Sequence, residues 1–183
     1  MSIPNVLSIF RLVLVPVFVA SFFLLPPGQR YWLAVILVVS GVSDVLDGYI
    51  ARKFHQITQL GKVLDPAADK ITVAAVLFCL TFPYPKIIPV LAVYACKELL
   101  MLLGGLILSG RGVKLVSSRW FGKLATFMIY TVMFLFIIIP QVRDIWLIVC
   151  NTAVIAVTLF ALIMYGREFV RLLKESSLSR REV

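Results

Sequence analysis

Six apolar runs, each close to twenty residues long, fill most of this chain. They cover residues 7–25, 31–50, 63–82, 86–109, 121–139 and 144–165. An α-helix needs about 20 apolar residues to cross the hydrocarbon core of a bilayer, which is roughly 30 Å thick. The 183 residues are 61% hydrophobic and 15% charged, so little sequence remains for a domain outside the membrane. We therefore predict an all-α integral membrane protein with six transmembrane helices, in which residues 1–183 form a single domain.

The basic residues predict the orientation of these helices. Of the 18 Lys and Arg residues, twelve lie in or next to three segments, 51–62, 110–120 and 166–183, and three lie in or next to the other connections. The remaining three are Arg11, Lys70 and Lys97, elsewhere in the runs. Because basic loops stay on the cytoplasmic side, both termini are predicted to be cytoplasmic, with residues 166–183 as a basic tail. This tail is expected to be either a helix that lies against anionic headgroups or a solvated, frayed segment. The basic residues of the cytoplasmic segments explain the net charge of +9, so we predict no nucleic-acid partner.

Acidic residues are concentrated at one end of two runs. The chain has only nine Asp and Glu residues, and four of them fall between positions 44 and 69. Asp44 and Asp47 share a face of the second run near its cytoplasmic end, and Asp65 and Asp69 share a face at the start of the third. The third helix must extend back through Val63 to be long enough to cross the bilayer. Since the connection between the runs reverses the chain, we expect the two pairs to reach the same depth and face one another.

Four carboxylates in one small volume need a counter-ion, because mutual repulsion and partial desolvation oppose their ionisation. Only oxygen ligands are available, which favours Mg²⁺, Mn²⁺ or Ca²⁺. Gly48, Ala51 and Gly61 would let a bulky ligand approach the backbone, and Arg52 is placed to meet a phosphate. A small cation carrier is an alternative function, but the acids form a cluster near one surface instead of a series across the bilayer.

The acids and small residues follow a fixed order along the chain. It reads Asp44-x-x-Asp47-Gly48-x-x-Ala51-Arg52, then eight residues, then Gly61-x-x-x-Asp65-x-x-x-Asp69. This order resembles the signature of the CDP-alcohol phosphotransferase family, membrane enzymes of phospholipid synthesis, at every position of that signature. The resemblance implies six helices with the signature on the second and third. It also implies transfer of a phosphatidyl group from CDP-diacylglycerol to an alcohol hydroxyl, with release of CMP.

The resemblance implies a role for each residue of the signature. Mg²⁺ or Mn²⁺, in a two-metal site, would be held by Asp44, Asp47, Asp65 and Asp69. The catalytic residues would be Asp69, as general base, and Asp65. The CDP donor would be bound by Asp47, Gly48, Ala51, Arg52 and Gly61. The family also implies a homodimer, and the short chain without a targeting extension is expected in a bacterial inner membrane, with its site facing the cytoplasm.

Residues outside the signature suggest the acceptor alcohol. The opening Ile3-Pro4-Asn5-x-x-Ser8-x-x-Arg11 resembles the phosphatidylglycerophosphate synthase branch of the family, whose acceptor is glycerol 3-phosphate. Lys97-Glu98 resembles an Arg-Glu pair of that branch, and residues 122–126 resemble its Gly-Lys-x-Lys-Thr. The chain departs from the branch at two positions, since Gly105 and Ala125 replace expected cations.

Several side chains are therefore candidates for holding an acceptor phosphate. They are Asn5, Ser8, Arg11, Lys97, Arg119 and Lys123. Glycerol 3-phosphate is the predicted acceptor. The alternatives are a cardiolipin synthase or an enzyme that uses inositol phosphate, inositol or serine.

Overall fold

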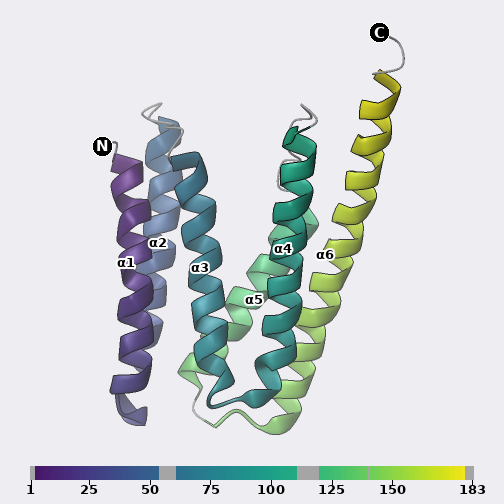
Figure 1. Cartoon of the computed structure of the whole chain (residues 1–183). Helices are drawn as coiled ribbons and strands as arrows, with labels where there is room; N and C mark the ends of the chain where they lie inside the picture. The colour runs from purple at the N-terminus through teal and green to yellow at the C-terminus, as the bar shows by residue number, and fades with distance from the viewer. Residues whose placement is uncertain (1–2, 54–60, 111–119, 140, 180–183) are drawn as a thin grey trace. The chain divides into compact units, whose positions relative to one another are not determined.

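The computed structural model of the chain describes residues 3–53, 61–110, 120–139 and 141–179, and every regular element in this part is a helix. The prediction of an all-α protein is confirmed. The elements follow one another as Figure 1 shows. They are α1 (Ile3–Leu24), η1 (Pro27–Gln29), α2 (Tyr31–Lys53), α3 (Gly61–Thr81), η2 (Pro85–Ile87), α4 (Ile88–Gly110), α5 (Trp120–Ile138) and α6 (Asp144–Ser179), where η marks a short 3₁₀ helix.

Prolines lie where the first and third helices end. α1 ends just before Pro26, and the Leu25 N–H donates to the Ser21 carbonyl at 3.0 Å. α3 ends just before Pro83, and the Tyr84 N–H donates to the Leu80 carbonyl at 3.0 Å. Proline cannot donate a backbone hydrogen bond and clashes with the preceding turn, so it stops a helix that its neighbours would otherwise continue. At its other end, α3 begins at Gly61 and so extends back through Val63, as the length of the apolar run required.

Four of the described helices are long and apolar enough to cross a membrane. These spans are Asn5–Leu24, Pro85–Gly110, Trp120–Ile138 and Asp144–Lys174. α2 contributes a shorter apolar stretch, Tyr31–Leu46, and α3 carries four charged residues in its first three turns. The helices support an integral membrane protein, while crossing by α2 and α3 and the cytoplasmic placement of both termini stay predictions.

The chain forms two compact units. The first contains Met1–Pro85 and Thr131–Val142, and within it α1 packs against both α2 and α3. Its interior is apolar over most of its length, with Phe18, Leu33 and Val73 almost fully buried. The N-terminal ends of α1 and α3 and the C-terminal end of α2 lie at one end of this unit (Figure 1). The acidic residues of the signature lie near these helix ends.

The second unit contains Lys86–Tyr130 and Arg143–Val183. α4 packs against α6, and the Asn151 side-chain amide on α6 donates to the Lys86 carbonyl at 2.9 Å. Phe121 and Ala125 of α5 and Ala161 of α6 form a buried cluster. These contacts join α4 and α5 to α6.

α6 continues as a helix through residues 166–179, where we predicted a basic tail. Its 36 residues correspond to a length of roughly 54 Å at about 1.5 Å per residue. A hydrocarbon core is only about 30 Å thick. The basic residues Arg167, Arg171 and Lys174 therefore lie on a regular helix that is longer than a membrane crossing requires.

Candidate active site at the ends of α1, α2 and α3

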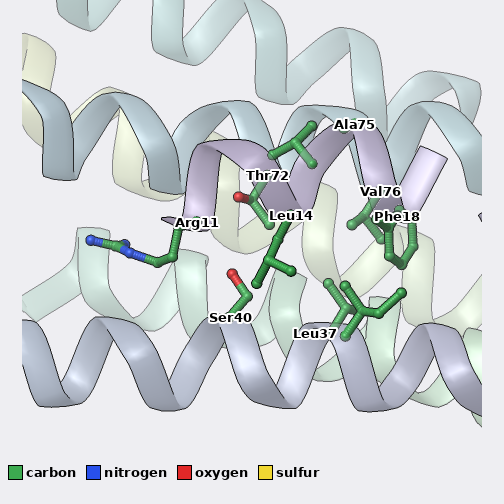
Figure 2. A pocket seen from close by; sticks show the side chains of 10 residues that line it. Arg11, Leu14, Phe18, Leu37, Ser40, Thr72, Ala75 and Val76 are labelled. Atoms are coloured by element: carbon green, nitrogen blue, oxygen red, sulfur yellow. The ribbon is translucent and has the colours of Figure 1, made fainter. Parts of the chain in front are cut away.

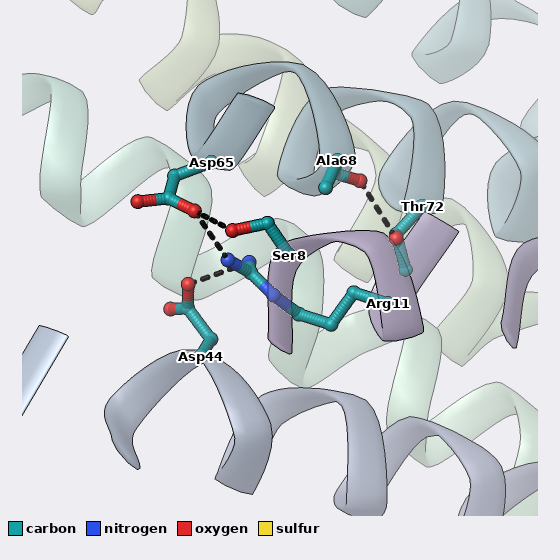
Figure 3. A network of polar contacts seen from close by, with 6 residues as sticks. All are labelled: Ser8, Arg11, Asp44, Asp65, Ala68 and Thr72. Atoms are coloured by element: carbon teal, nitrogen blue, oxygen red, sulfur yellow. Dashed lines mark hydrogen bonds and ion pairs between the residues drawn. The ribbon is translucent and has the colours of Figure 1, made fainter. Parts of the chain in front are cut away.

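Two aspartates of the signature meet at the side chain of Arg11. The Arg11 Nη1 lies 2.6 Å from the Asp44 Oδ1, and its Nη2 lies 3.3 Å from the Asp65 Oδ1. The Ser8 hydroxyl donates to the same Asp65 oxygen. Figure 3 shows the guanidinium of α1 between the carboxylates of α2 and α3. The structure thus brings both halves of the signature to one point on α1.

α1 presents its polar residues to this point along one side. Asn5, Ser8 and Arg11 are three residues apart, and their exposed fractions are 5%, 0% and 2%. A buried arginine is stable only when its charge is paired, because the loss of hydration is large. The contacts with Asp44 and Asp65 supply that pairing and determine which side of α1 faces α2 and α3.

The two carboxylates are far more exposed than the guanidinium between them. The exposed fractions of the Asp44 and Asp65 side chains are 53% and 39%, against 2% for Arg11. A cation or phosphate can therefore reach the carboxylates from the open side, while Arg11 lies on the interior side.

A small apolar cavity lies deeper in the same unit, beside the aliphatic part of Arg11. Its volume is about 10 Å³, which is room for about one water molecule. Leu14, Phe18 and Val76 are among the side chains that line it, and Figure 2 shows the guanidinium of Arg11 extending away from them. This cavity is too small for a substrate, whereas the exposed side of the Asp44 and Asp65 carboxylates is open to a ligand.

The other residues of the signature lie on the same two helices. Asp69 follows Asp65 by one turn of α3 and is half-buried, and Gly61 is buried at the start of α3. The backbones of Asp47, Gly48, Ala51 and Arg52 belong to the last turns of α2, but their side chains lie outside the described part of the chain.

The donor set fits a hard divalent cation. Asp44 and Asp65 already converge on a positive charge, and both offer oxygen ligands of the kind that Mg²⁺ and Mn²⁺ prefer. Among the described side chains, no group of three or more Asp, Glu, His or Cys residues is gathered closely enough to hold a metal. A complete metal site would thus require further ligands from Asp69 or Asp47 and a change at Arg11.

The remaining acceptor candidates belong to the second unit. The Lys97 Nζ lies 2.7 Å from the Glu98 Oε1 and 5.5 Å from the centre of the Tyr94 ring, and the lysine side chain is only 7% exposed. Its charge is therefore already paired inside the unit. Lys123 is exposed on α5, and Arg119 lies outside the described residues.

The two departures from the expected cation pattern also lie in this unit. Ala125 is 0% exposed within the cluster of α5 and α6, so a lysine at this position would be buried. Gly105 lines an apolar groove of about 500 Å³ between α4 and α6. Neither environment favours an extra positive charge.

Sequence reasoning missed the pairing of Arg11 with the signature aspartates and assigned Arg11 to an acceptor phosphate. One feature of the sequence pointed to it. An arginine inside an apolar run needs an acidic partner at the same depth. The adjacent runs carry four acids near their cytoplasmic ends, Asp44, Asp47, Asp65 and Asp69, and the sequence does not indicate which of them it is.

Comparison with known proteins agrees with the signature. The family model for CDP-alcohol phosphatidyltransferases matches residues 1–164. A cardiolipin synthase (CMP-forming) of Streptomyces coelicolor is 39% identical over 134 residues, which are 69% of this chain and 60% of that protein. A putative cardiolipin synthase of Mycobacterium bovis is 33% identical over 184 residues, which are 96% of this chain and 86% of that protein.

A second group of relatives is similar over a shorter stretch. The CDP-diacylglycerol–glycerol-3-phosphate 3-phosphatidyltransferase of Haemophilus influenzae is 46% identical over 76 residues, which are 42% of this chain and 41% of that protein. The chain thus covers well under two thirds of the Streptomyces and Haemophilus relatives. Since the family model extends over 164 of the 183 positions, the chain belongs to the CDP-alcohol phosphatidyltransferase family.

Proposed function

We propose that this protein transfers a phosphatidyl group from CDP-diacylglycerol to an alcohol hydroxyl and releases CMP. The observation that carries the proposal is the convergence of Asp44 and Asp65, from the two halves of the signature, at a point open to ligands. The membership of the family supports the same reaction. An integral membrane position would let the donor keep its acyl chains in the bilayer while its nucleotide reaches the carboxylates.

The aspartates would hold the metal, and the rest of the signature would hold the donor. Asp44, Asp47, Asp65 and Asp69 are the proposed ligands of Mg²⁺ or Mn²⁺. The cation would neutralise charge that develops on the phosphate oxygens as the bond to CMP breaks. Gly48, Ala51, Arg52 and Gly61, together with Asp47, would bind the CDP group.

Asp69 is the proposed general base. The acceptor oxygen attacks the phosphorus that carries the diacylglycerol, the bond from this phosphorus to the oxygen of CMP breaks, and the hydroxyl proton passes to the Asp69 carboxylate. The attack is in line and needs no covalent intermediate. Asp65, one turn before Asp69 on α3, would help to hold the divalent cation, whose positive charge would keep the reacting phosphate in place.

Two observations favour phosphatidylglycerol as the acceptor over the glycerol 3-phosphate expected from the sequence. The relatives whose similarity runs along nearly the whole chain are putative cardiolipin synthases, whereas the glycerol-3-phosphate enzymes match 42% to 45% of it. Cardiolipin contains two phosphatidyl groups joined by glycerol, so a CMP-forming synthesis adds the second group to phosphatidylglycerol. We therefore propose phosphatidylglycerol as the acceptor, with glycerol 3-phosphate as the alternative.

The second observation is the shortage of cations for a strongly charged acceptor. A phosphomonoester such as glycerol 3-phosphate carries about 1.5 to 2 negative charges at pH 7, whereas the phosphodiester of phosphatidylglycerol carries one. The buried Ala125 and the pairing of Lys97 with Glu98 leave fewer cations for a phosphomonoester.

The test is CMP release by the purified full-length protein from CDP-diacylglycerol with Mg²⁺ or Mn²⁺. Phosphatidylglycerol, glycerol 3-phosphate, inositol phosphate, inositol and serine are offered separately, and mass spectrometry identifies the lipid product. We expect release with phosphatidylglycerol and a loss of at least about a hundredfold in Asp69→Asn, because a general base contributes about 10² to 10⁴ in rate. Asp144→Asn, at an exposed acid of the second unit, should keep the wild-type rate.

The outcomes separate the parts of the proposal. Release with glycerol 3-phosphate alone would contradict the proposed acceptor and leave the transfer reaction standing. A wild-type rate in Asp69→Asn would contradict the role of the general base. No release with any alcohol, in folded protein, would contradict the function itself.

The proposed setting is a homodimer in a bacterial inner membrane, with the site facing the cytoplasm. The family resemblance supports the dimer, and the twelve basic residues of the three predicted cytoplasmic segments support the orientation. Labelling of single cysteines from either side of sealed vesicles would test the orientation, and a cytoplasmic label at the external connections would contradict it.

A further inference from the structure

Arg11 occupies the place between two proposed metal ligands. Its two terminal nitrogens contact the Oδ1 atoms of Asp44 and Asp65 at 2.6 and 3.3 Å. A guanidinium fork forms strong charge-assisted bonds with carboxylates and cannot lose its charge by deprotonation. Two carboxylates that face each other are therefore neutralised in part by a cation that belongs to the protein.

A divalent ion bound by the same carboxylates would need oxygen atoms that Arg11 now holds. We propose that the Arg11 guanidinium is the counter-ion of Asp44 and Asp65 in the metal-free protein, and that the metal must displace it. This inference deepens the proposed function and rests on its metal site. Arg11 is thus a positioning residue, which keeps two ligands from α2 and α3 together until the ion binds (Figure 3).

The surroundings of Arg11 determine where a displaced guanidinium can go. The space below it is an apolar cavity of about 10 Å³, lined by Leu14, Phe18 and Val76 among others. A charged group will not enter such a cavity, and a guanidinium does not fit in it. The displaced side chain therefore stays at the open end of the unit, where an anionic phosphate would be a new partner.

A variant of Ser8 distinguishes two effects on Asp65, the loss of a hydrogen bond to the carboxylate and the loss of the positive charge beside it. Its hydroxyl donates to the same Asp65 oxygen as Arg11 does, but it carries no charge. Ser8→Ala thus removes a hydrogen bond from the carboxylate without removing the competing cation. Arg11→Gln removes the cation, and Arg11→Lys keeps the charge but loses the fork that reaches both carboxylates.

The experiment measures Mn²⁺ binding to metal-stripped, full-length protein in detergent, with neither nucleotide nor lipid substrate. Free Mn²⁺ is counted by electron paramagnetic resonance. We expect Arg11→Gln to bind Mn²⁺ about tenfold more tightly than the wild type, the change expected when one charge-assisted hydrogen bond no longer competes. Arg11→Lys should fall between the two. Arg30→Gln is the matched control, because Arg30 lies in the same unit over the Phe22 ring and contacts no signature residue described here.

The Mn²⁺ dependence of thermal unfolding provides a second test, because a merely structural role of Arg11 would lower the unfolding temperature of the variant equally with and without the ion. Without metal, Arg11→Gln should unfold at a lower temperature than the wild type, since Asp44 and Asp65 then repel each other. With saturating Mn²⁺ this difference should shrink, because the ion replaces the lost charge. An equal loss of stability with and without Mn²⁺ would assign Arg11 a structural role and overturn the inference.

The Mn²⁺ affinities give the other refuting outcomes. Unchanged or weaker binding in Arg11→Gln means that the guanidinium does not compete with the ion. If Arg11→Lys binds Mn²⁺ with wild-type affinity, the positive charge at this position lowers the affinity without direct contact with both carboxylates. That result also contradicts the proposal that Mn²⁺ must displace the guanidinium. Failure of this inference leaves CMP release by the wild type intact, whereas tighter binding without any CMP release would support displacement and contradict the proposed function.

Discussion

Replacing Gly122 by alanine would drive a methyl group into the ring of Tyr165. A Cβ at Gly122 would meet the tyrosine hydroxyl oxygen and would lie 3.0 Å from Cζ and 3.2 Å from Cε2. The ring cannot swing aside freely, since it packs edge-on against Phe121 with their centroids 4.7 Å apart. Gly122 therefore allows α5 and α6 to approach each other closely.

Two other glycines serve as reference positions for the effect of Gly→Ala on stability. A Cβ at Gly166 would meet nothing within 4 Å, and one at Gly104 would touch only the Phe169 ring at 3.5 Å, an ordinary contact. In an open helical position, Gly→Ala stabilises a protein by about 1 kcal/mol. Overpacking costs about 1–3 kcal/mol, so Gly122→Ala should be less stable than Gly166→Ala by that amount.

The assay is thermal unfolding in one detergent at one heating rate. For a chain of this size, 1 kcal/mol corresponds to about 2–4 °C in Tm. We expect Gly166→Ala and Gly104→Ala to match or exceed the wild-type Tm, and Gly122→Ala to lie about 2–12 °C below Gly166→Ala. Tyr165→Phe removes the nearest atom and should recover part of the loss, with a coupling of about 1 kcal/mol in the double mutant.

Two results would refute this reasoning. Gly122→Ala could gain stability as Gly166→Ala does, which would mean that α5 and α6 are not in close contact at this position. The effects of Gly122→Ala and Tyr165→Phe could instead add without coupling, which would mean that the tyrosine is not the obstacle.

Three further predictions concern the second unit and the metal. Lys97→Met should lower the free energy of unfolding by about 3 kcal/mol in denaturant titrations, since it removes the cation of a largely buried ion pair with Glu98. Lys97→Met combined with Glu98→Leu should regain most of the loss, and equal losses in both variants would contradict this. Ala125→Lys should yield little folded protein on size exclusion because the site is fully buried, and a variant that folds with wild-type yield and stability would contradict the burial of this position. EDTA should abolish CMP release and added Mn²⁺ or Mg²⁺ should restore it, whereas release in excess EDTA would contradict a metal-dependent reaction.

The helices could be predicted closely because their ends depend on local chemistry. Pro26 and Pro83 follow the ends of α1 and α3, although Pro16 and Pro66 lie inside these helices. The apolar runs have the length of a membrane crossing. A helix in the basic tail was one of two expectations, but its continuity with the sixth run was not predicted, because hydropathy falls after Tyr165. Leu172, Leu173 and Lys174 are all good helix formers, so the helix continues.

The aspartate pairs could be located from sequence, but the position of Arg11 between them could not. α1 is apolar on nearly every side, so its hydrophobic pattern does not indicate which face meets α2 and α3. That rotation is set by a few polar side chains, whose partners lie far away in the sequence. Nor does the sequence indicate that Ala125 is fully buried, since this depends on how α5 packs on α6.

The pairing of Arg11 has a consequence for how the protein enters the membrane. The ribosome makes Arg11 well before Asp44 and Asp65, so α1 reaches the bilayer with an arginine that has no acidic partner. An unpaired arginine in the hydrocarbon core is unfavourable by about 2.5–3.5 kcal/mol on insertion scales, and its long side chain reaches for the headgroups. With the predicted topology, in which α2 and α3 also cross the bilayer, we expect α1 to reach its final depth and rotation only after α3 has been synthesised, so that the first three helices insert together.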